Sequence, residues 1–206
     1  MNLDTRDLTI RGIPVIFLRD SQNVALVPEG NQITMKRNRS FQFDGMVEAG
    51  LVRFSGSNFF FSYEDFKIRM QKIDSLRLSI RTSEYNQYGE PVLTDIDNAI
   101  EDMTGELYID DPANKSGLES NPEYPKFSSL ENSYIYFDSP DIQNGVYDRS
   151  SFYFELDSFS IDSLDNFVPK NISPSGTFIS AGILPPLEME MSLRDDNSLG
   201  FYLEAP

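Results

Sequence analysis

Apolar and polar residues alternate along most of this 206-residue chain, in short segments that are rich in β-branched and aromatic side chains. A period of two places successive side chains on opposite faces of a β-strand. Gly, Pro, Asn and Asp end each segment after a few residues. The pattern predicts an all-β fold of many short antiparallel strands, arranged as a sandwich or as an elongated, β-solenoid-like sheet. Strands are expected at 7–10, 14–18, 24–27, 32–36, 40–44, 46–54, 58–63, 66–70, 75–80, 105–109, 133–137, 151–156, 159–161, 176–183, 188–193 and 200–203.

One segment departs from the period of two. Ile96, Ile100 and Met103 follow one another at helical spacing. A residue of the pair 94–95 can cap the first turn of a helix there, because Thr and Asp accept hydrogen bonds from free backbone N–H groups. We therefore expect at most one short helix in the chain, near residues 94–104.

The local sequence predicts two irregular features, a β-bulge and a tight turn. The apolar alternation shifts by one residue at Gly50, as it does where a strand carries an extra residue, and this predicts a β-bulge. Asn144–Gly145 supply the positive φ angles of a tight turn. They lie between two aromatic segments, 133–137 and 151–156, and so predict a hairpin with a long loop.

The net charge of −16 is unevenly distributed along the chain. Residues 1–82 contain 12 Lys and Arg against 9 Asp and Glu, whereas residues 83–206 contain 5 against 24. The one basic cluster, at residues 36–39, is three charges beside an expected strand, as in a solvated turn or a guarded strand edge. Because the chain is otherwise acidic, we expect no nucleic-acid partner. Charge and composition divide the chain into three parts, which we expect to share one domain. These are a near-neutral to basic β-rich segment at 1–109, an acidic Pro- and Asn-rich loop at 110–129 and an acidic β-rich segment at 130–206.

The chain contains no His, Cys or Trp. It therefore has no imidazole base, no thiol nucleophile and none of the usual zinc ligands of those types. Two facing carboxylates can still hydrolyse a glycoside. The acids of this chain stand beside turn-forming residues, however, where Asp is favoured for its hydrogen bonds to the backbone. We expect no enzymatic activity, with a carboxylate-based hydrolase as an alternative. Its candidate acids are Asp110 with Asp111, Glu64 with Asp65, Asp138 with Asp141, and Asp195 with Asp196.

Calcium is the cation that best matches these acids, because Ca²⁺ takes several carboxylate and carbonyl oxygens from loops. Asp110 and Asp111 lie in one such loop, and Asp138 and Asp141 lie in another, without EF-hand spacing. A further alternative is thus a calcium-assisted β-sandwich that binds carbohydrate or another ligand, with no other cofactor. The tyrosines considered for stacking on a sugar are Tyr85, Tyr88 and Tyr124.

Two aromatic runs have apolar residues on both faces of the expected strand. They contain Phe59 and Phe61 in the first half of the chain, and Tyr134 and Tyr136 in the second. Burial on both sides of a covered sheet explains such runs. An exposed apolar face explains them too, and the four residues are then candidates for binding a partner.

The stretch from Phe43 to Phe61 reads FDGMVEAGLVRFSGSNFFF. It resembles the repetitive β-strands of very large bacterial envelope-associated proteins of the AsmA/TamB kind, and the likeness extends over residues 40–80 and 176–203. The resemblance implies an elongated sheet that serves as an envelope scaffold or lipid conduit and has no catalytic residues. The acidic loop at 110–129 interrupts such a repeat.

These observations favour a non-catalytic, β-rich structural or interaction module of a larger bacterial surface or envelope protein. Its partner would be another protein or the rest of a longer parent chain, and the oligomeric state is left open. No apolar run approaches the roughly 20 residues of a membrane span, so we expect no transmembrane segment. The first residues do not form a signal peptide, and the location in the cell envelope or outside the cell is an expectation.

Overall fold

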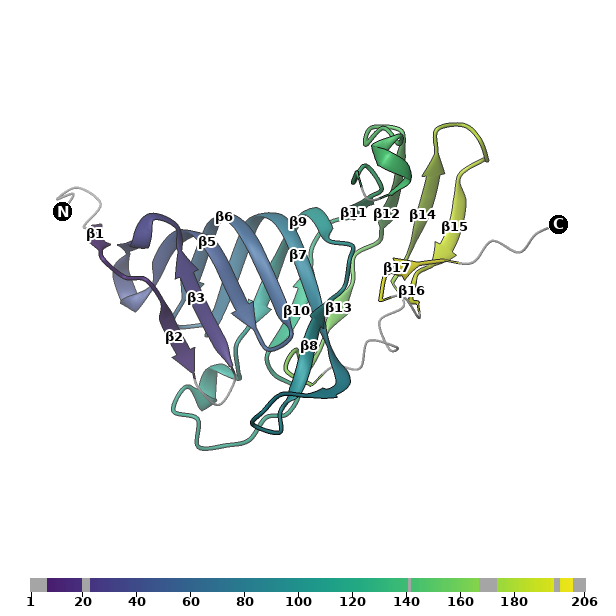
Figure 1. Cartoon of the computed structure of the whole chain (residues 1–206). Coiled ribbons are helices and arrows are strands. Elements are labelled where there is room, and N and C mark those ends of the chain that lie inside the picture. Colours follow the sequence, from purple (N-terminus) through teal and green to yellow (C-terminus); the bar gives the residue numbers. More distant parts are fainter. Residues whose placement is uncertain (1–6, 20–22, 141, 167–173, 195–196, 202–206) are drawn as a thin grey trace.

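Strands dominate the computed structural model of the chain (Figure 1). The structure describes residues 7–19, 23–140, 142–166, 174–194 and 197–201. They make up 54% of it, and no helix in these ranges reaches seven residues. The strands form a large antiparallel sheet that is not a closed barrel. The predicted all-β fold is therefore confirmed.

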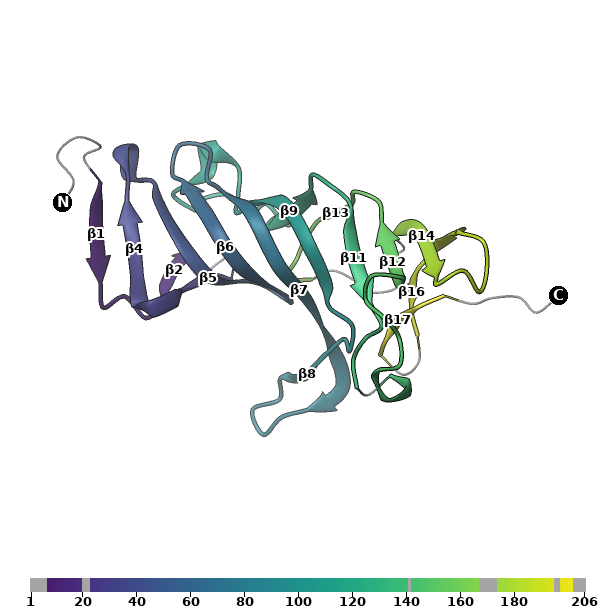
Figure 2. The ribbon, with the colours of Figure 1, turned by 90° about the horizontal axis from the view of Figure 1, so that it is seen from above.

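Ten strands lie side by side along the central path of the sheet (Figures 1 and 2), and every neighbouring pair is antiparallel. The path follows the sequence from one end of the molecule to the other. Its strands, in order across the sheet, are β1 (Leu8–Arg11), β4 (Gln32–Met35), β5 (Phe41–Ala49), β6 (Val52–Ser62), β7 (Lys67–Tyr85), β9 (Ile100–Tyr108), β11 (Ser133–Tyr136), β12 (Phe152–Leu156), β14 (Ser175–Ser180) and β15 (Leu187–Glu190).

Shorter strands branch from this path. The start of β5 pairs with β4, and the rest of β5 pairs with β3. In the same way β9 pairs with β11 near its start and with β10 at its end. The branching strands are β2 (Ile16–Arg19), β3 (Val24–Pro28), β8 (Pro91–Asp95), β10 (Lys126–Ser129) and β13 (Ser160–Ile161), while β16 (Ser192–Leu193) and β17 (Leu199–Gly200) form a separate small sheet. Single 3₁₀ turns stand at η2 (Glu29–Asn31), η3 (Arg37–Arg39), η4 (Pro112–Asn114) and η5 (Gln143–Gly145).

One face of the sheet stays apolar from end to end. Directly opposed residues in neighbouring strands share a face, so the strand register carries an apolar position from one strand to the next. Near the first edge Ile10 faces Ile33, and near the last edge Phe178 faces Leu187. Buried residues on this face between those ends include Phe41, Phe61, Ile68, Leu107, Met103, Ile100, Ile135 and Phe154.

The curled sheet and its branches cover this apolar face. Phe127 of β10 packs against Phe54 of β6, with ring centroids 4.8 Å apart, although the two strands are not paired. Beyond β13, the carbonyl of Leu164 accepts a hydrogen bond of 2.8 Å from the Leu51 N–H at the β5–β6 turn. At the other end, Phe201 beside β17 covers Phe178, with ring centroids 4.7 Å apart. Both ends of the sheet therefore contribute to one hydrophobic core.

The expected helix near 94–104 is wrong, because the segment forms the end of β8 and the start of β9. Asp102 has a φ of 55°, and the β7–β9 register shifts beside it, between Met70 and Ile73. The pairing with β7 keeps one register from Ile100 to Met103, so it is the left-handed backbone of Asp102 that breaks the strict alternation and lets both apolar side chains be buried. The helical spacing in the sequence thus comes from a strand that contains one left-handed residue.

The bulge expected at Gly50 is also wrong. Ala49 pairs directly with Val52, so Gly50 and Leu51 form a two-residue turn between β5 and β6. Gly50 has a φ of 60°, and a Cβ there would lie 2.4 Å from the Cα of Asp165. The turn therefore needs glycine for its backbone conformation and for close packing.

Other local predictions have clear outcomes. The hairpin predicted around Asn144–Gly145 is confirmed as β11 and β12, which pair in register with η5 in the connecting loop. The acidic loop ends earlier than expected, because residues 126–129 form β10. The strands expected at 66–70 and 75–80 are one continuous strand, β7.

Phe54 provides a test of the packing between β6 and β10. Its side chain is fully buried, so replacement by Ala leaves a cavity that the surrounding strands fill only partly. We expect Phe54→Ala to lower the free energy of unfolding by about 3–5 kcal/mol in urea denaturation. The control is Phe17→Ala on β2, where the ring is 67% exposed and the change should stay within about 0.5 kcal/mol. Equal effects of the two substitutions would contradict the packing described.

Candidate functional site

The first pair of predicted calcium ligands organises its own loop. Asp110 is 1% exposed, and its carboxylate accepts hydrogen bonds from the side-chain amides of Asn114 and Asn121 at 3.0 and 2.7 Å. The Asp111 carboxylate accepts from the Ala113 N–H at 2.7 Å and caps η4. Both acids act here as Asp commonly does in turns, by holding backbone and amide N–H groups.

The second pair of predicted calcium ligands lies elsewhere. Asp138 follows β11 and forms an ion pair of 3.7 Å with Arg149, and Asp141 lies outside the described residues. Arg149 also contacts Asp102 near the start of β9, whereas Asp110 follows the end of β9. Eight residues of extended strand span about 26 Å, so the two pairs are too far apart to share one ion. Within the described ranges, no three acidic side chains are grouped as metal ligands.

Another acid pair considered for hydrolysis is also engaged in local contacts. Asp65 accepts a hydrogen bond from the Ser62 hydroxyl at 2.9 Å and forms an ion pair of 3.0 Å with Arg69. Asp195 and Asp196 lie outside the described residues.

Phe59 and Phe61 are not available to a partner, which corrects the prediction for them. They are 0% and 4% exposed and point into the core from β6. Phe59 packs edge-on against Phe43, with ring centroids 5.5 Å apart, and Phe61 packs against Phe41 at 4.9 Å. The apolar run that suggested a binding face is therefore the interior of a covered sheet.

Tyr134 and Tyr136, in contrast, lie half-exposed on the outer face of β11. Their rings stack with centroids 5.8 Å apart, and Tyr153 of β12 packs against both. The guanidinium of Arg149 lies over the Tyr136 ring, 3.5 Å from its centroid. We call these four residues the tyrosine surface.

Carboxylates surround Arg149 on the tyrosine surface. Its guanidinium contacts Glu101 at 2.6 Å, Asp102 at 3.2 Å and Asp138 at 3.7 Å. Burial alone would lower the pKa of Arg149, but the bonds to Glu101 and Asp102 outweigh it and raise that pKa. The guanidinium is therefore a permanent cation that holds β9 against the loop after β11.

The Tyr136 phenol is held in its protonated form. Burial, and then the hydrogen bond of 3.0 Å that its hydroxyl donates to Asp102, raise the pKa of Tyr136 to about 12. Burial and the nearby Glu155 carboxylate also raise the pKa of Tyr134. At neutral pH the surface therefore offers phenol hydroxyls and aromatic edges for binding, and neither phenol can serve as a base.

A cavity of about 700 Å³ lies beside the tyrosine surface. Tyr136 of that surface lines the cavity, together with Glu101 and Asp138, which contact Arg149. The volume lies in the range of pockets for small molecules. Other lining residues come from β7 (Arg77), from the segment before β9 (Asp97 and Asn98) and from the start of β17 (Ser198 and Leu199).

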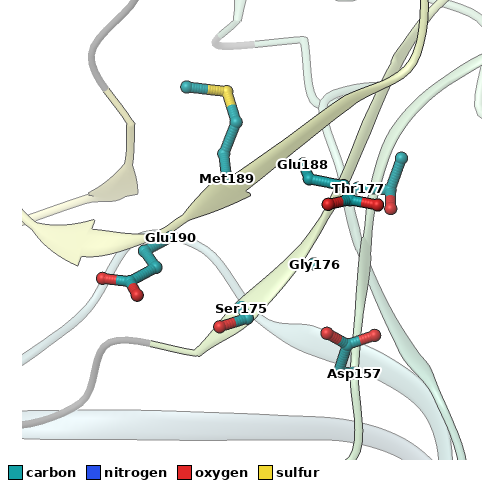
Figure 3. A pocket seen from close by; sticks show the side chains of 7 residues that line it. All are labelled: Asp157, Ser175, Gly176, Thr177, Glu188, Met189 and Glu190. Carbon is teal, nitrogen blue, oxygen red and sulfur yellow. The ribbon is translucent and has the colours of Figure 1, made fainter.

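A smaller hollow of about 380 Å³ lies on the outer face of β14 and β15 (Figure 3). Glu188, Glu190 and Asp157 supply carboxylates to it, beside the hydroxyls of Ser175 and Thr177. Neither Lys nor Arg is among the residues that line it. This end of the sheet is therefore acidic on its outer face.

Of the tyrosines considered for sugar stacking, Tyr85 and Tyr88 are 68% and 78% exposed, beyond the body of the sheet. Tyr124 is buried to 9% exposure, and the ammonium of Lys126 lies over its ring. The structure brings none of them to the tyrosine surface.

Sequence reasoning missed Arg149, Glu101 and Asp102 as parts of the site. They meet only because β9 lies beside β11, whereas 47 or 48 residues separate them from Arg149 along the chain. The only local signal was a cation within a strongly acidic segment.

Comparisons of this chain with protein-family profiles, curated proteins and solved structures gave no match. In the part of the chain that the structure describes, no helix is long and apolar enough to cross a membrane.

Tyr136 gives the site a pH dependence that can be measured. Its folded-state pKa lies above the ordinary value of 10.0, so the stability it contributes is complete below pH 10 and is lost as the pH rises toward 12. We expect the wild-type chain to unfold less readily than Tyr136→Phe at neutral pH, with the difference shrinking between pH 10 and about 12. Denaturation at a series of pH values measures it, and a constant difference would contradict the assignment.

Proposed function

We propose that the chain is a non-catalytic structural and interaction module of a larger bacterial surface or envelope protein. The observation that carries this proposal is the large sheet, whose first and last strands are each paired on one side among the described strands. Its outer face carries the tyrosine surface. The assignment to an envelope protein rests on the resemblance of residues 43–61 to envelope β-repeats.

The described acids support a module without catalysis. Glu106 on β9 is an example: burial would raise its pKa, but hydrogen bonds from Lys67 and Tyr108 lower it overall. Its carboxylate accepts from the Lys67 ammonium at 2.8 Å and from the Tyr108 hydroxyl at 2.6 Å. A carboxylate with these partners holds two strands together and is poorly suited to act as a general base near neutral pH.

The tyrosine surface is the part of the outer face best suited to a protein partner. Tyr and Arg are enriched in interfaces, because each combines a large apolar area with hydrogen-bonding groups. Tyr134, Tyr136 and Tyr153 already pack against one another, so a partner would order few additional side chains. The carboxylates around Arg149 form a polar rim.

The test compares tyrosines of different surfaces in the same chain. We expect the double variant Tyr134→Ala/Tyr136→Ala to lose about 90% of the binding of one identified envelope protein that the wild type retains, since each interface tyrosine can contribute 1 kcal/mol or more. Tyr85→Ala/Tyr88→Ala is the matched control, because it removes two exposed tyrosines from another surface. Quantitative pull-down from envelope extract measures the binding. Equal retention by the two variants, or no specific protein bound by the wild type, would contradict the proposal.

A further inference from the structure

The two terminal strands of the sheet path each have one edge that no described strand pairs with. Among the described strands, β1 pairs only with β4, and β15 pairs only with β14. They lie at opposite ends of the molecule (Figures 1 and 2). An edge strand presents a row of backbone N–H and C=O groups that can pair with another strand.

The direction of the strands allows the sheet to continue by simple repetition. All nine neighbouring pairs in the path are antiparallel, and the path contains ten strands. Strand β15 therefore runs opposite to β1. A second copy in the same orientation would place its β1 antiparallel to the β15 of the first copy.

The faces of the two edges also match. The sequence of β1 is Leu-Thr-Ile-Arg and that of β15 is Leu-Glu-Met-Glu, so each alternates apolar and polar residues over four positions. Ile10 and the apolar residues of β15 pack against the same hydrophobic core. Figure 3 shows Met189 pointing away from Glu190, to the other side of β15. A strand pairing that keeps the sheet continuous therefore places apolar residues together on the inner face.

The charges of the two edges are complementary. The outer face of β15 carries Glu188 and Glu190 beside the acidic hollow. The outer face of β1 carries Arg11, whose guanidinium donates a hydrogen bond of 3.0 Å to Gln32 on β4. Opposite charges directly across a strand pair stabilise it, and like charges destabilise it.

We propose that β15 of one copy of this chain pairs with β1 of a second copy and extends the sheet head to tail. The register that brings Arg11 opposite Glu188 also places Ile10 opposite Met189 and Thr9 opposite Glu190, and it is the register that we propose. This inference rests on the proposed function, since it names a second copy as one partner of the module. The contact joins two different surfaces of the chain, so a pair of copies still presents one β1 edge and one β15 edge to further copies. In this register three residue pairs lie within both strands, which makes the association weak and dependent on concentration.

A charge swap tests the proposed register by sedimentation velocity at increasing protein concentration and low salt. We expect the wild type to self-associate, and Arg11→Glu or Glu188→Arg alone to weaken the association about tenfold. The double variant Arg11→Glu/Glu188→Arg restores opposite charges at the contact and should return the association to near the wild-type value. Controls with the same changes of charge are Lys72→Glu on β7 and Glu131→Arg just before β11, at exposed positions that several strands separate from β1 and β15. A monomeric wild type, or a double variant no stronger than the single ones, would overturn the proposal.

A cross-link tests the same register independently of affinity. Because the chain has no cysteine, Thr9→Cys and Glu190→Cys can be made in separate molecules and mixed under oxidising conditions. Opposed positions on neighbouring strands lie within the reach of a disulfide. We expect the mixture to yield a covalent dimer of the two variants several-fold faster than a mixture of Thr9→Cys with Glu131→Cys. Equal rates would overturn the proposed pairing.

These experiments separate the inference from the proposed function. They use the purified chain alone and leave the tyrosine surface unchanged. If self-association fails while the tyrosine variants still lose their envelope partner, the head-to-tail pairing is wrong and the interaction module stands. If the chain self-associates but the tyrosine variants bind as the wild type does, the tyrosine surface is not the binding surface.

Discussion

The register of the sheet is the constraint on which the rest of this structure depends. A slip of one residue in any strand pair would exchange its buried and exposed faces. The pairing nevertheless keeps one face apolar from Ile10 on β1 to Leu187 on β15. Because that face is continuous, a single hydrophobic core serves a long sheet, and the outer face is free to carry charge and tyrosines.

Irregular positions in the strands preserve this register. The left-handed backbone of Asp102 keeps both Ile100 and Met103 of β9 on the apolar face, and the same residue accepts the Tyr136 hydrogen bond on the outer face. Gly50 makes a turn so tight against Asp165 that no side chain fits there. Asp102 and Gly50, both with a positive φ angle, thus help to close the core, and Asp102 also connects it to the tyrosine surface.

The sequence predicts the local features of this fold more completely than the distant ones. Alternation identifies the strand segments, and Asn144–Gly145 identify the β11–β12 hairpin, because both signals lie within a few residues. The left-handed residue Asp102 gives β9 an apolar spacing like that of a helix, and only the pairing with β7 distinguishes the two. Phe59 and Tyr134 belong to similar aromatic runs, yet one is buried and the other half-exposed, since Phe59 points to the inner face of the sheet and Tyr134 to the outer face. The contacts of Arg149 with β9 depend on strand order, which no local pattern encodes.

Hydrogen exchange of the native chain, read by mass spectrometry, tests the continuous sheet most directly. The account predicts that peptides from β6 and β7 and those from β12 become exchangeable in one cooperative unfolding event, since they share a core. Peptides from β1 and β15 should exchange faster, because each of these strands pairs with one neighbour only among the described strands. Separate unfolding events for the parts before residue 110 and after residue 130 would contradict the single sheet.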